Sequence, residues 1–97
     1  MIENEIISDV ADFYGITASN ILSKRRVRRY VDARTVVCYL LRYVCTMTTT
    51  EIGDVVHLDH TSVVYHNKKA QDWLNMPKLN DKGAKAIIEL KKRYGNE

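Results

Sequence analysis

The sequence predicts an all-α, single-domain helical bundle of 97 residues that contains a helix-turn-helix. Apolar residues recur at steps of three and four through most of the chain, which is the spacing of one helix face. No stretch alternates strictly between apolar and polar residues, as a half-buried strand would. With 45% hydrophobic residues and one proline, the chain can build a single modest core from long uninterrupted helices.

The first half of the chain predicts three helices and a basic loop. Residues 2–14 have the pattern of an amphipathic helix. A short helix over 18–22 is expected to follow, opened by Thr17 as its N-cap. The basic loop over residues 23–29 interrupts the apolar pattern. Residues 32–45 then form the most hydrophobic segment, which we expect to be the central helix of the core.

The second half predicts the helix-turn-helix. A capping box at Thr48 indicates a short helix over 49–56. A tight turn should follow, after which Asp59 is suited to cap a longer helix over 60–74. A short helix, a tight turn and a longer helix with a polar front make up a helix-turn-helix, here at about residues 49–74.

The distribution of charge points to a polyanionic partner. Residues 1–23 carry a net charge of −4, residues 24–34 carry +5, and the remainder carries +2. Between Lys24 and Arg29, every residue except Val27 is basic. A cluster of this density is the electrostatic footprint of a nucleic-acid-binding protein. The alternative is an ordinary solvated charged face.

The first turn of the longer helix holds the candidate base-reading residues. In a helix-turn-helix this turn enters the major groove of DNA. Here it reads Asp59-His60-Thr61-Ser62. A carboxylate can accept a hydrogen bond from cytosine N4, and hydroxyls can bond to either kind of base edge. In the alternative interpretation, Asp59 only caps the helix and the next three residues are ordinary surface residues.

Four separated motifs resemble the C-terminal DNA-binding domain, domain IV, of the bacterial chromosomal replication initiator DnaA. They are Ser23-Lys24-Arg25-Arg26, Ala33-Arg34, Glu51-Ile52-Gly53 and Asp59-His60-Thr61-Ser62-Val63. Their order and spacing match the family across residues 2–75, with one apparent single-residue deletion near His57-Leu58. The resemblance implies a Trp-repressor-like helical fold that binds double-stranded DNA at a short asymmetric site, the DnaA box.

The resemblance also implies roles for individual residues. Asp59, His60 and Thr61 would read bases in the major groove, and Ser62 would support them. Arg26 would enter the adjacent minor groove. The residues that would lie at or near the DNA backbone are Lys24, Arg25, Arg28, Arg34, Thr35, Arg42, Thr50, Lys68 and Lys69.

Two departures from the family pattern bear on specificity. Thr35 stands where the family usually has a glutamine that helps to hold DNA. His57-Leu58 replaces the Gly-Gly-Arg that usually precedes the recognition helix, which removes one residue and one charge near the groove. For Lys68 and Lys69 an alternative stays open, since both could be plain solvated lysines.

Several other function classes are not supported. The chain has no GxxxxGK[ST] phosphate loop, so we expect no nucleotide and no other cofactor. Cys38 and Cys45 lie two turns apart on a predicted helix, too far for a disulfide, and no cysteine–histidine spacing fits a metal site. An apolar stretch of transmembrane length and a signal-peptide pattern are both missing, so no membrane association is expected. Together these features favour the cytoplasm, in a bacterial nucleoid or a phage-infected cell.

We therefore expect a non-enzymatic, stand-alone DnaA-like protein, although an excised domain fits as well, with a role in replication initiation or its regulation. Asp59 and His60 point about 100° apart on a helix and cannot form a catalytic pair. One alternative is a transcription regulator with a different operator. Another is an adaptor that binds a replication initiator or another replication protein through the acidic first helix or the Ile87–Tyr94 face. That face belongs to a C-terminal accessory helix expected over about 80–94.

Overall fold

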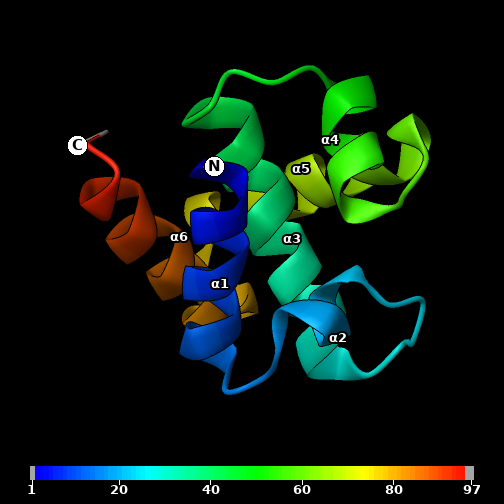
Figure 1. Cartoon of the computed structure of the whole chain (residues 1–97). Helices are drawn as coiled ribbons and strands as arrows, with labels where there is room; N and C mark the ends of the chain where they lie inside the picture. Colours follow the sequence, from blue (N-terminus) through cyan, green and yellow to red (C-terminus); the bar gives the residue numbers. More distant parts are fainter. Residues whose placement is uncertain (1, 96–97) are drawn as a thin grey trace.

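The computed structural model describes residues 2–95. Its elements are α1 (Ile2–Tyr14), α2 (Ala18–Leu22), α3 (Arg28–Tyr43), α4 (Thr49–Val56), α5 (His60–Asn75), the short 3-10 turn η1 (Pro77–Leu79) and α6 (Asp81–Arg93) (Figure 1). Residues 2–95 contain no strand. The predicted all-α bundle is confirmed, and the helix-turn-helix is α4 and α5.

Helix α3 forms the centre of the core. It is buried without interruption from Asp32 to Leu41, and it contacts each of the other α-helices. Figure 1 shows it running through the middle of the bundle, with α1 and α6 to its left and α4 at the upper right. A helix that is buried all round must be the core helix of its domain. This confirms the role predicted for the most hydrophobic segment.

Helix α3 begins at Arg28, earlier than the predicted residue 32. The Nε atom of Arg28 lies 3.3 Å from a carboxylate oxygen of Asp32, one turn further on, and this pair supports the first turn. The basic block is therefore divided. Residues 23–27 form the loop, while Arg28 and Arg29 belong to α3. The prediction of a loop extending to residue 29 is wrong by two residues.

The predicted caps are present. The Thr17 hydroxyl accepts a hydrogen bond from the Asn20 backbone at 3.1 Å, and the Asn20 side chain completes a capping box. Thr48 and Glu51 form a second capping box at the start of α4, with bonds of 2.9 and 3.1 Å. Each box satisfies backbone N–H groups that would otherwise have no partner at the helix start.

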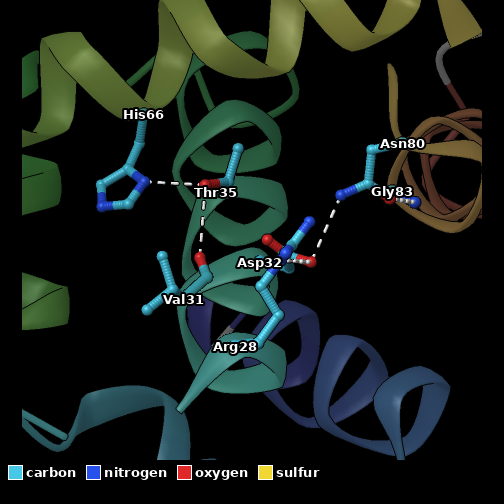
Figure 2. A network of polar contacts seen from close by, with 7 residues as sticks. All are labelled: Arg28, Val31, Asp32, Thr35, His66, Asn80 and Gly83. Atoms are coloured by element: carbon cyan, nitrogen blue, oxygen red, sulfur yellow. Dashed lines mark hydrogen bonds and ion pairs between the residues drawn. The ribbon is translucent and has the colours of Figure 1, made fainter. Parts of the chain in front are cut away.

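A polar network attaches α6 to the start of α3 (Figure 2). Asn80 caps α6, because its side-chain oxygen accepts from the Gly83 backbone at 2.8 Å. The amide nitrogen of Asn80 donates to the Asp32 carboxylate at 3.2 Å. Asp32 also holds Arg28, so the C-terminal helix is connected to the turn that follows the basic loop.

Both cysteines are free thiols. Cys38 is buried in the core, where burial raises its pKa to about 12, and Cys45 is half-buried. A buried protonated thiol of this kind is chemically inert. Among residues 2–95, histidine, cysteine and acidic side chains do not gather into a group that could hold a metal. Over the same residues, no helix combines the length and the apolar character needed to cross a membrane.

Candidate nucleic-acid interface

The turn between α4 and α5 is short and depends on a glycine. His57 adopts the left-handed conformation, with φ of 62°, and it ends α4. The Leu58 backbone N–H donates to the Gly53 carbonyl at 3.0 Å, which closes the turn. A Cβ atom on Gly53 would overlap the Leu58 carbonyl oxygen, so glycine is required there. The predicted tight turn at His57-Leu58 is confirmed.

The first turn of α5 is fixed by Asp59. Its Oδ1 atom accepts a hydrogen bond from the Ser62 backbone at 2.8 Å. This bond holds the pKa of Asp59 below its ordinary value, so the carboxylate stays ionised. A carboxylate has about four acceptor positions, so part of its capacity remains beside the hydrogen bonds from Ser62 and Thr61. Asp59, His60 and Thr61 are exposed, and Ser62 is half-buried. Capping and base reading are therefore compatible roles for Asp59.

The basic loop is held from inside by Arg34, which is only 5% exposed. Its Nε donates to the Ile21 carbonyl at 2.6 Å, and its Nη2 donates to the carbonyls of Ser23 at 2.5 Å and Asn20 at 3.3 Å. Burial, and then the nearby charge of Arg26, lowers the pKa of Arg34. Most of this guanidinium is thus engaged by the backbone at the entrance of the loop, although Arg34 still lines the neighbouring groove. A phosphate contact at Arg34 stays a prediction.

The prediction for Thr35 requires a correction. It is fully buried, and its hydroxyl lies 3.2 Å from the Val31 carbonyl and 2.7 Å from Nδ1 of His66 (Figure 2). Because Thr35 has no exposed surface, the expected DNA contact at this residue is wrong. Its hydroxyl instead connects α3 to α5 behind the reading face. Burial, with Lys69 and Arg34 nearby, lowers the pKa of His66 to about 4, so the ring is neutral at pH 7.

A groove lies between the basic loop and α5. Residues from the loop line one part of it, and residues from α5 and the preceding turn line another. The exposed or half-buried residues of the predicted site that line it are Lys24, Arg26, Asp59, Thr61, Ser62 and Lys69. The structure therefore brings together two segments separated by more than 30 residues of sequence. This is the arrangement that a loop and a helix need if they act on one ligand.

Six other residues of the predicted site are exposed outside the lining of this groove. They are Arg25, Arg28, Arg42, Thr50, His60 and Lys68. Arg42 lies at the far end of α3, roughly 20 Å along the axis from Arg28 at 1.5 Å per residue. Its Nη1 donates to the Met47 carbonyl at 3.0 Å. The groove therefore accounts for part of the predicted set, and DNA contacts at these outlying residues remain predictions.

Two exposed residues that line the groove were not among the predicted DNA contacts. Tyr65 is 62% exposed and lies one helical turn after Thr61, with the Lys69 ammonium 5.8 Å from its ring centre. The spacing of four from Thr61 is a signal that could have identified it. His57 also lines the groove. Its position follows from the left-handed turn, for which a histidine gives no clear sequence signal.

Comparison with known proteins identifies the family of this chain. The sequence matches the family described as bacterial dnaA protein helix-turn-helix over residues 4–70. The chain belongs to this DnaA family. The matched stretch contains the basic loop, α4 and most of α5, whereas η1 and α6 lie beyond it. The helix-turn-helix domain of DnaA is a DNA-binding domain rather than a catalytic one.

The relatives are much longer proteins, each named as a chromosomal replication initiator protein DnaA. DnaA 1 of Chlamydia pneumoniae is 37% identical over 60 residues, which cover 62% of this chain and 13% of the relative. DnaA 1 of Chlamydia trachomatis serovar D is 28% identical over 91 residues, covering 94% and 20%. DnaA of Aquifex aeolicus is 32% identical over 69 residues, covering 70% and 17%. The chain thus spans about a fifth or less of these relatives.

Proposed function

We propose that this DnaA-family chain binds double-stranded DNA sequence-specifically, with α5 in the major groove and the basic loop in the adjacent minor groove. The observation that carries the proposal is the shared groove lined by the loop and by the first turn of α5. One sugar-phosphate strand separates the two grooves of a duplex. A protein that enters both must therefore leave room for that strand, and the space between loop and helix would hold it.

The residues divide into two kinds of contact. Asp59, His60 and Thr61, supported by Ser62, would read base edges, because they are polar and lie in the first turn of the recognition helix. Arg26 would enter the minor groove, where its positive charge meets the enhanced negative potential. Base contacts of these kinds supply specificity, whereas phosphate contacts supply register and affinity.

The backbone contacts come from cations around the groove and beyond it. Lys24 and Lys69 line the groove, and the Tyr65 hydroxyl beside Lys69 offers a further phosphate donor. The outlying residues that would reach phosphates are Arg25, Arg28, Arg42, Thr50 and Lys68. Each such neutralised phosphate releases counterions, so binding should weaken steeply as salt increases.

The role in the cell would be in replication initiation or its regulation, because the relatives are named replication initiators. No phosphate-loop motif occurs in this sequence, so nothing in it suggests ATP-driven assembly. A DNA-binding unit of this kind could occupy initiator sites without opening an origin. We therefore propose that this chain competes with a full-length initiator for a shared DNA site, and that it does so in the cytoplasm, where the bacterial nucleoid lies.

Selection of bound duplexes from a random pool, at near-physiological salt, tests the proposed function. We expect enrichment of one short motif related to the DnaA box, and displacement of a full-length initiator from that motif by this chain. An unrelated motif would overturn the replication role and favour a transcription regulator. If no motif is enriched, the proposal of sequence-specific binding fails. If, in addition, Arg26→Ala binds duplexes as well as the wild type, the adaptor alternative is favoured.

A further inference from the structure

The second turn of α5 carries two large apolar side chains that the core does not use. Val64 is 51% exposed and Tyr65 is 62% exposed, although they are adjacent on a helix whose opposite face is buried. As neighbours on a helix they point about 100° apart, so they do not form one patch. Tyr65 faces the groove already described, whereas Val64 is not part of the groove lining. The groove therefore does not explain why Val64 is exposed.

Helix geometry places Val64 on the reading face of α5. At about 100° per residue, Val64 lies roughly 40° around the helix from His60 and one turn further along. Lys68 lies one turn beyond Val64, again about 40° around. The buried residues of the helix, including Val63 and Ala70, fall on the other side. An exposed ridge thus runs from His60 through Val64 to Lys68 and continues the surface proposed to enter the major groove.

The charges around this ridge indicate what covers Val64. Lys68 follows it, Lys69 lines the neighbouring groove, and the basic loop faces the same groove. These cations favour a polyanion over the apolar surface of a partner protein. On the major-groove edge of a base pair, the C5-methyl of thymine is the one bulky apolar group. A branched aliphatic side chain is well suited to bury that methyl.

We propose that Val64 is a specificity-determining residue that contacts a thymine methyl within about two base pairs of the base read by His60. The distance follows from the rise of about 6 Å per four helical residues. This inference rests on the proposed function. The inference extends the base-reading surface to the second turn of α5. It also requires a 5-methyl pyrimidine at one position of the target.

Deoxyuridine scanning tests the proposal. Each thymine of the enriched duplex is replaced singly by deoxyuridine, which removes the methyl and leaves base pairing unchanged. For the wild type we expect a loss of roughly three- to tenfold in affinity at one position, as one buried methyl predicts. Val64→Ala should show the same loss on the thymine duplex and no further loss on the uracil duplex. Alanine is a good helix former, and circular dichroism melting verifies that the variant folds.

Ile88→Ala is the matched control, since Ile88 is 47% exposed but lies on α6. It should keep both the affinity and the methyl dependence of the wild type. The proposal is overturned if no uracil substitution lowers the affinity of the wild type, or if Val64→Ala is as sensitive to the same methyl as the wild type. It is also overturned if Val64→Ala loses affinity only for a protein partner. When no duplex is enriched, the proposed function fails and this inference fails with it. An enriched duplex without a Val64-dependent methyl defeats this inference alone.

Discussion

The Thr35–His66 contact illustrates how single residues set the geometry of the reading helix. Thr35 lies on the central helix α3, and His66 lies on the inner face of α5. Their contact, 2.7 Å between Oγ1 and Nδ1, is buried behind the residues proposed to read bases. Low polarity around the ring makes its charged form unfavourable. The orientation of α5 should therefore depend on His66 staying neutral.

We expect stability to fall as the pH drops from about 6.5 towards 4. His66 has a folded-state pKa of about 4, below its ordinary value of 6.5, so over this range the unfolded chain binds a proton that the folded chain does not. The loss from this residue should reach roughly 2–3 kcal/mol by pH 4.5. Urea unfolding of the wild type and of His66→Gln across this range measures it. If the free energies of unfolding of the two proteins changed with pH in the same way, His66 would not be the group responsible.

At the scale of elements, the sequence predicted more of the helix-turn-helix than of the loop that accompanies it. Capping boxes and apolar spacing depend on neighbours a few residues away, so α4 and its N-terminal capping box could be predicted. The burial of Arg34 and Thr35 could not, because it arises from packing of α3 against α2 and α5. Family resemblance put both residues on DNA, whereas the structure buries both side chains. Tyr65 was missed even though its spacing from Thr61 was informative.

Arg34→Met should destabilise the protein and loosen the basic loop. The change leaves the carbonyls of Ile21 and Ser23 without their donors, at a cost of roughly 1–3 kcal/mol. Arg34→Lys should rescue little, because an ammonium lacks the planar fork that reaches several carbonyls at once. Urea unfolding gives the stability, and duplex titration gives the binding. If Arg34→Met keeps full stability but lowers the salt dependence of binding, Arg34 acts by contacting a phosphate rather than by holding the loop.

At the scale of the whole molecule, charge is divided between regions of the chain. The first 23 residues are acidic and contain no lysine or arginine, whereas the next 11 hold the basic cluster. In the fold, α1 packs beside α6, while the basic loop faces the first turn of α5 (Figure 1). The acidic side chains of α1 lie beside the basic helix α6, where Arg93 pairs with Asp9. The basic loop is therefore the densest positive region that a duplex can approach at encounter.

Lys24→Ala should weaken binding to every duplex by a similar factor. Its charge lines the groove but carries no base-reading chemistry, so losing it removes about one phosphate contact. The slope of the logarithm of the binding constant against the logarithm of salt concentration should fall by about one. Lys85→Ala, on the exposed surface of α6, is the matched control and should leave the slope unchanged. An unaltered slope in Lys24→Ala would remove Lys24 from the backbone contacts.

The most direct test of sequence reading by α5 is the binding of His60→Ala to the enriched duplex and to a scrambled duplex at the same salt concentration. His60 is exposed in the first turn of α5, and it makes none of the caps that hold the turn. We expect a loss of about 1–3 kcal/mol on the enriched duplex and little change on the scrambled one, because base contacts specify the sequence. Equal losses on both duplexes would contradict base reading by this helix.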